Sequence, residues 1–378
     1  LRVIVPLERN AVVEAPVETG PAWTERLLGH EAAEQAFLTA FAAGRLPHAW
    51  LISGPRGVGK CTFAYRIARF LLSQPMQAEE GGLFGGSAPA APASLQMAPE
   101  HRVFRQVAQQ GHPDFRLLER TPNPKTGRMR SEIVIEDVRA VIDFLHLKPA
   151  ASPWRVVIVD SADDLNRNSA NALLKILEEP SANTVLLLLS HVPQALLPTI
   201  RSRCRKLVLQ PLPGDRIAAE LGARFPDTKA QDRALAAATA GGSLGQAIRM
   251  IERDGVGLLR DLGSLLASWP KLDAGLLHKL GDKLAGRDQD AQFDLAVELL
   301  GWWFARLARA SATGIMPNPE LFQGESALIQ RMRAAASLDR WEPGPKAGLG
   351  RSFPRHRRSW RQGWGTLSLR PISEPLRS

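Results

Sequence analysis

A glycine-rich run from Leu51 to Thr62, LISGPRGVGKCT, constrains this chain more than any other stretch. Gly54, Gly59 and Lys60 fit the phosphate-binding pattern G-x-x-x-x-G-K-[ST], in which backbone N–H groups close on phosphate oxygens and the lysine reaches the terminal phosphates. The last position of the pattern needs a hydroxyl to hold Mg²⁺, but Cys61 stands there, and a thiol is a poor ligand for a hard cation. The run therefore predicts a nucleotide-binding fold whose hydrolysis is compromised.

The residues around this run have the order strand, loop, helix that the motif requires. Ala49 to Ile52 is a short apolar run typical of a buried strand, and apolar residues from Phe63 to Leu71 recur at helical spacing. A glycine-rich turn without a ligand is the alternative, and this context argues against it. The predicted nucleotide-binding residues, including one carboxylate further along the chain, are Gly54, Pro55, Arg56, Gly57, Val58, Gly59, Lys60, Cys61, Thr62 and Asp160.

Composition excludes several classes of protein. The chain has 378 residues, of which 44% are hydrophobic and 23% charged, as in globular proteins with more than one domain. The sequence has no apolar run of about 18 residues to span a membrane, and its N-terminal residues lack a secretory signal pattern. Cys61 and Cys204 are the only cysteines, too few for a zinc site and consistent with a reducing compartment. We therefore expect a cytoplasmic protein with no membrane partner and no bound metal.

Strand and helix patterns alternate up to about residue 210. Apolar runs predict strands at 115–118, 155–160 and 184–190, and helical spacing predicts helices at 29–45, at 135–147 and before Pro180. This alternation predicts an α/β fold with a parallel sheet covered by helices on both faces. A stretch rich in Gly, Ala, Pro and Ser, at about 75–99, predicts a flexible insertion.

Beyond Pro211 the pattern predicts helices only. They are expected near 214–225, 229–240, 244–253, 255–268 and 325–336. A further helix is predicted to face the core with a stripe of Phe293, Val297, Leu300, Phe304 and Leu307. We divide the chain into an α/β domain at 1–210, a small helical domain at 211–270, a helical C-terminal domain at 271–341 whose completeness the pattern leaves open, and an irregular basic tail at 342–378.

The net charge of +10 is concentrated at the C-terminus. Residues 341–378 contain eight Lys or Arg and two acidic residues, a net charge of +6, which leaves +4 for the other 340 residues. One interpretation of this tail is a basic arm with interleaved tryptophans that binds nucleic acid. The other is a disordered or out-of-frame segment, and we favour it because helical periodicity stops abruptly after Trp341.

Asp160 ends the predicted strand at 155–160. In P-loop ATPases, a carboxylate at this position approaches the ligand shell of Mg²⁺. Such enzymes carry a glutamate at the next position to polarise the attacking water, and this chain carries Ser161. A serine cannot act as that base at neutral pH.

Several motifs together resemble those of bacterial clamp-loader subunits, which are AAA+ proteins. The run NALLKILEEP at 171–180 is similar to their N-A-L-L-K-x-L-E-E-P segment, and TIRSRC at 199–204 is similar to their S-R-C motif. Residues 28–31 and 46–50 also resemble the family. The resemblance covers about residues 25–340. It implies an AAA+ P-loop domain with a parallel sheet, followed by a helical lid domain and a helical collar domain.

Within this family the chain resembles the delta-prime type of DNA polymerase III subunit more than the gamma/tau type. Gamma/tau subunits keep the P-loop hydroxyl, the glutamate and a lid-domain arginine, whereas this chain has Cys61, Ser161 and Gly245. The family's four-cysteine zinc module is also missing from the sequence, so no zinc is expected. These departures imply a subunit that binds ATP or ADP, if at all, without efficient hydrolysis.

The resemblance implies a function in DNA replication. Arg203 would act in trans as an arginine finger on a neighbouring ATPase subunit, and the chain would be a stator in a hetero-pentamer with gamma/tau and delta subunits. Through that complex it would act on the sliding clamp and primer-template DNA, as part of a DNA-directed DNA polymerase holoenzyme. An active ATPase of the gamma/tau type or another P-loop motor is the alternative, and a free-standing DNA-binding protein rests on the tail alone. Glu178 and Glu179 are either surface charges or interface contacts.

Overall fold

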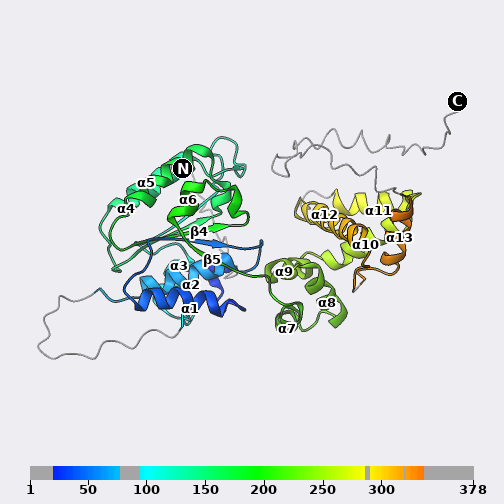
Figure 1. The fold of residues 1–378 in the computed structure, drawn as a ribbon, viewed down its shortest axis with the longest axis horizontal. Coiled ribbons are helices and arrows are strands. Elements are labelled where there is room, and N and C mark those ends of the chain that lie inside the picture. Colours follow the sequence, from blue (N-terminus) through cyan, green and yellow to red (C-terminus); the bar gives the residue numbers. More distant parts are fainter. Residues whose placement is uncertain (1–19, 77–93, 286–289, 319, 336–378) are drawn as a thin grey trace, which may run out of the picture.

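The computed structural model describes residues 20–76, 94–285, 290–318 and 320–335 (Figure 1). Most of the expected insertion at 75–99 and all of the tail at 342–378 lie outside the described residues. Among the helices that are described, none combines the length and the apolar character needed to cross a membrane.

A five-stranded parallel sheet forms the centre of the N-terminal domain. Its strands follow the order β2-β3-β4-β1-β5, and each neighbouring pair is parallel. Strands β1, β3 and β4 are apolar and buried along almost their whole length because helices cover both faces of the sheet. The predicted α/β fold with a parallel sheet is confirmed. The strands are β1 (Ala49–Ser53), β2 (Phe115–Glu119), β3 (Arg155–Asp160), β4 (Thr184–Ser190) and β5 (Arg205–Val208).

Two groups of helices cover the sheet. Side chains alternate between its faces, so Trp50 and Ile52 join the buried cluster of the first group while Ala49 and Leu51 join that of the second. The first group is α1 (Glu31–Ala42), α2 (Lys60–Leu72) and α3 (Arg102–Ala108), and the second is α4 (Ile135–His146), α5 (Arg167–Glu178) and α6 (Pro198–Arg203). The sequence did not predict α3, because seven residues are too few to establish a helical period.

The rest of the described chain is helical, as predicted. One buried apolar cluster extends from Leu212 to Ile329, and α10 contacts α8 and α9 as well as the three helices that follow it. The domain boundary at residue 270 stays a prediction. The helices are α7 (Gly214–Arg224), α8 (Ala230–Thr239), α9 (Leu244–Glu252), α10 (Gly255–Ala267), α11 (Ala274–Leu284), α12 (Asp290–Thr313) and α13 (Glu325–Ala335).

The predicted core stripe of α12 is wrong for most of its members. Phe293, Val297 and Phe304 are 51%, 49% and 45% exposed, and of the five only Leu307 is buried. The helix faces the core with a neighbouring stripe instead, which includes Leu295, Leu299, Trp303 and Leu307. Both stripes have helical spacing, so periodicity alone could not distinguish them.

Candidate phosphate loop and arginine site

The predicted phosphate loop joins β1 to α2 at the carboxyl edge of the sheet. Lys60 is the first residue of α2 and is only 4% exposed, and its ammonium donates to the carbonyls of Gly54 and Pro55 at 2.7 Å each. Burial lowers the pKa of Lys60 to about 8, although the carboxylates of Asp160 and Asp163 oppose the shift. The lysine is therefore a cation held inside the loop, at the position where the motif needs it to meet phosphate.

The loop contacts the helical region through two glycines. Gly57 has a φ of +72°, and its carbonyl accepts a hydrogen bond of 2.9 Å from the backbone N–H of Gly245, near the start of α9. A Cβ at Gly245 would lie 3.0 Å from that carbonyl oxygen, and a Cβ at Gly57 only 2.5 Å from Ser243 Oγ. Gly245, which stands where an arginine was expected, thus brings α9 against the phosphate loop.

Cys61 lies beside Asp160, as the motif predicts. Burial, and then the negative charge of Asp160, raise the pKa of the Cys61 thiol well above its usual value. The thiol therefore stays protonated at neutral pH, and a protonated thiol does not ligate a hard cation. Of the expected magnesium-binding groups, only the Asp160 carboxylate keeps suitable oxygens, so the residues present do not fit an Mg²⁺ site. Among the described residues, no group of three or more His, Cys, Asp or Glu is arranged to hold a metal ion.

The other predicted loop residues take different positions. Pro55 and Arg56 are exposed, whereas Val58 is buried and its carbonyl lies 3.0 Å from Nε2 of His30. Thr62 is 9% exposed and is the third residue of α2, one position beyond the place where the motif needs a hydroxyl.

Asp163 organises a polar cluster that the sequence did not identify. Its carboxylate accepts hydrogen bonds from Ser161 Oγ at 3.0 Å, from Ser190 Oγ at 2.7 Å and from the backbone N–H of His191. Burial, followed by the charges of Lys60 and Arg56, lowers the pKa of His191 to about 4, so this imidazole is neutral at pH 7. The available signal was the polar pair Ser190-His191 at the end of an otherwise apolar strand.

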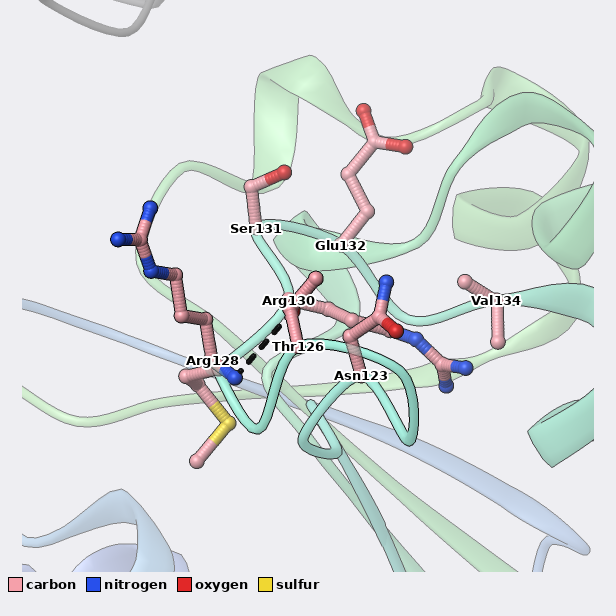
Figure 2. Close-up of a pocket in the computed structure, with 8 residues that line it drawn as sticks. Asn123, Thr126, Arg128, Arg130, Ser131, Glu132 and Val134 are labelled. Carbon is pink, nitrogen blue, oxygen red and sulfur yellow. Dashed lines mark hydrogen bonds between the residues drawn. The ribbon is translucent and has the colours of Figure 1, made fainter. Parts of the chain in front are cut away.

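Two shallow cavities border this edge of the sheet. One, of about 300 Å³, is lined by Arg56, Glu119, Arg120, Met129, Asp160, Ser161, Asp164 and His191. Burial, and then the charge of Asp160, raise the pKa of Glu119 in it. Figure 2 shows the other, of about 370 Å³, in the loop between β2 and α4, with Arg128, Ser131 and Glu132 around it. Both are polar and open, unlike an enclosed pocket for a small apolar ligand.

Arg203 lies at the edge of the sheet where the parallel strands begin, whereas the phosphate loop lies at the edge where they end. This arginine is the last residue of α6, and only Cys204 separates it from β5. Leu209, just after β5, donates to Ser53 beside the phosphate loop. The four residues of β5 therefore separate Arg203 from its own loop by roughly 13 Å of strand. Arg203 is exposed and pairs with Glu178 at 2.8 Å, and Ser202 donates to Thr199 within the same helix. Cys204 is buried, and burial raises its pKa to about 12.

A parallel sheet with a phosphate loop after β1, an aspartate at the end of β3 and a helical region in contact with the loop defines a P-loop protein of the AAA+ class. Residues 29–213 match the family model described as DNA polymerase III, delta subunit. The DNA polymerase III subunit delta' of Escherichia coli is 31% identical over 253 residues, which cover 65% of this chain and 68% of that protein. The chain belongs to the DNA polymerase III delta-prime family.

Other comparisons define the extent of the likeness. The subunit delta' of Pseudomonas aeruginosa is 37% identical over 197 residues, 52% of this chain and 53% of that protein. The matched region thus spans about half the length of this relative. A solved structure of a gamma subunit-related protein from Thermotoga maritima has a TM-score of 0.32 at 20% identity, covering 77% of this chain and 74% of that one.

Proposed function

We propose that this chain is a stator subunit of a clamp loader, which assembles with gamma/tau and delta subunits and supplies Arg203 to the ATP site of a neighbour. Such a complex loads a sliding clamp onto primer-template DNA. A guanidinium beside a γ-phosphate stabilises the negative charge of the transition state and raises the rate by about 10³–10⁵.

The position of Arg203 carries this proposal. The side chain is exposed at the edge of the sheet opposite its own phosphate loop, so it is poorly placed to act on a nucleotide bound there and well placed to meet another subunit. Arginine also suits phosphate recognition because its planar fork donates two parallel hydrogen bonds.

The phosphate loop of this chain supports a role in which the chain itself does not hydrolyse ATP. Lys60 and the N-terminus of α2 can attract phosphate. Hydrolysis also needs a metal ion and a positioned water. Cys61 is a protonated thiol, and Ser161, which stands where a glutamate was expected, donates to Asp163. We therefore propose that ATP or ADP binds this loop without efficient hydrolysis, which distinguishes the chain from an ATPase of the gamma/tau type.

The experiment compares the chain alone with a complex reconstituted from it and its gamma/tau-type and delta-type partners. We expect no Mg²⁺-dependent hydrolysis by the chain alone, and ATPase activity in the complex that falls by at least about tenfold with Arg203→Ala while assembly persists. Arg205→Ala is the control, because Arg205 is also exposed and lies two residues away. Hydrolysis by the isolated chain that Lys60→Ala abolishes would favour the gamma/tau-type alternative.

A further inference from the structure

The side chain of Arg203 is held in place by its own chain. Its Nη2 lies 2.8 Å from Oε1 of Glu178, the last residue of α5, and its Nη1 donates to the carbonyl of Thr199 at 3.2 Å. These contacts come from two directions, one from a neighbouring helix and one from the preceding turn of α6. The guanidinium is therefore oriented even without a second subunit.

This arrangement leaves the guanidinium able to bind an anion. An arginine carries five N–H donors; the carbonyl of Thr199 accepts from one of them on Nη1, and Glu178 forms an ion pair with Nη2. The side chain is 36% exposed and that of Glu178 is 48% exposed, so the pair lies at the surface, where a second subunit can reach it. Arg203 can thus keep both contacts and still donate to a phosphate.

Packed helices set the position of Glu178. Helices α5 and α6 contact each other, and Ile176, Leu177 and Ile200 are buried in the same apolar cluster. Glu178 follows two of these anchored residues directly, and Cys204, which is also buried there, fixes the end of α6. The carboxylate and the guanidinium are therefore presented by rigid elements.

We propose that Glu178 is a positioning residue for Arg203: it orders the guanidinium before the neighbouring subunit docks, so that the finger meets the phosphate without first losing its rotamer freedom. This inference rests on the proposed function, because it concerns the same arginine. A long side chain that is already ordered pays less conformational entropy when it engages. Since the pair is exposed, it contributes little to the stability of the fold.

The test measures ATPase turnover of the reconstituted complex. Glu178→Ala should lower kcat about 3- to 10-fold and leave KM for ATP unchanged, because the guanidinium that Glu178 positions acts in the transition state. Glu178→Gln should recover part of the loss, since its amide oxygen keeps a partial negative charge beside Nη2. In an Arg203→Ala background, removing Glu178 should have no further effect. Glu179→Ala is the matched control: Glu179 is the next residue, is also exposed, and forms no ion pair within the described part of the chain.

The outcomes separate this inference from the proposed function. Unchanged turnover with Arg203→Ala would contradict the finger itself, and the positioning role with it. If Arg203→Ala lowers turnover but Glu178→Ala behaves like Glu179→Ala, Arg203 acts on the neighbouring ATP site as proposed and the positioning role of Glu178 is wrong. Increased turnover with Glu178→Ala would mean that the carboxylate restrains the arginine, which also overturns the inference. A melting temperature lower for Glu178→Ala than for Glu179→Ala would assign the loss to the fold instead.

Discussion

Neighbouring residues of the phosphate loop have opposite consequences for ligand binding. Lys60 is a buried cation whose ammonium, within the described part of the chain, is bonded to two carbonyl groups of the loop, so an incoming phosphate offers it a better partner. Cys61, one residue later, is held protonated by burial and by the charge of Asp160. Phosphate recognition and metal recognition normally depend on adjacent positions of the motif, and here only the first of these positions keeps its usual residue.

Cys61→Thr should restore a hydroxyl at the metal-binding position. We expect ADP affinity in the presence of Mg²⁺ to rise about 3- to 10-fold, a rough estimate for one added oxygen ligand, while affinity without Mg²⁺ stays the same. Hydrolysis should remain absent, because Ser161 still lacks a carboxylate. Calorimetric titrations with and without Mg²⁺ measure this difference. If the wild-type chain already responds to Mg²⁺ as strongly as the variant, another group supplies the missing oxygen.

The charge of Lys60 should make nucleotide binding depend on pH. Because the folded-state pKa is about 8, the ammonium loses its proton as pH rises from 7 to 9, so affinity for ADP measured without Mg²⁺ should fall across this range. The ordinary pKa of lysine is 10.5, so between about 8 and 10.5 the unfolded chain binds more protons than the folded one. This group therefore makes the free energy of unfolding rise with pH in that window. Lys60→Met should remove both dependences; if it binds ADP as the wild type does, Lys60 has no role.

At the scale of secondary structure, polar clusters hold the elements of the sheet domain together. Asp114, which directly precedes β2, is completely buried, and its carboxylate accepts hydrogen bonds from the backbone N–H groups of Ala150, Ala151 and Ser152 at 2.7–3.0 Å. Arg155, at the start of β3, lies 3.9 Å from the same carboxylate and also donates to the carbonyl of Phe144 in α4. One side chain thus fixes the segment between α4 and β3 against β2.

Asp114→Asn should destabilise the sheet domain by about 2–3 kcal/mol. The amide would replace one acceptor oxygen by a donor facing a backbone N–H, and it would leave Arg155 without its opposite charge in a buried site. Denaturant unfolding followed by circular dichroism measures the change. Asp143→Asn, an exposed position on α4, is the control and should change stability by less than about 0.5 kcal/mol. Equal stability of the two variants would show that the buried carboxylate is dispensable.

At the scale of the whole molecule, the sequence predicted the order of elements better than their contacts. The strands and most helices follow from apolar runs and helical spacing, and the phosphate loop follows from a motif whose residues are contiguous. The contact between Gly57 and Gly245, the hydrogen bonds from Ser190 and His191 to Asp163 and the placement of Arg203 opposite its own loop join distant parts of the chain. No local pattern records such contacts. The stripe of α12 was misassigned for the same reason, since which face is buried depends on the helices that pack against it.

The exposed stripe of α12 provides a test at this scale. Phe293, Val297 and Phe304 present large apolar side chains on one face of the helix, and surfaces of this kind commonly mark contacts between proteins. If this face contacts another subunit, a Phe293→Gln, Val297→Gln, Phe304→Gln variant should fold as stably as the wild type yet fail to co-elute with gamma/tau-type and delta-type partners. Size-exclusion chromatography of the mixed subunits measures assembly, and thermal unfolding measures stability.

Arg309→Gln is the control for this variant, because Arg309 is an exposed residue on the same helix outside the stripe. Its assembly should equal that of the wild type. Removing exposed apolar area costs little in the isolated chain, since those side chains already contact water, whereas an interface would lose roughly 1.5–3 kcal/mol for each large side chain no longer buried. Three such losses are enough to dissociate a complex of micromolar affinity. Normal assembly of the triple variant would show that the stripe lies outside every subunit contact.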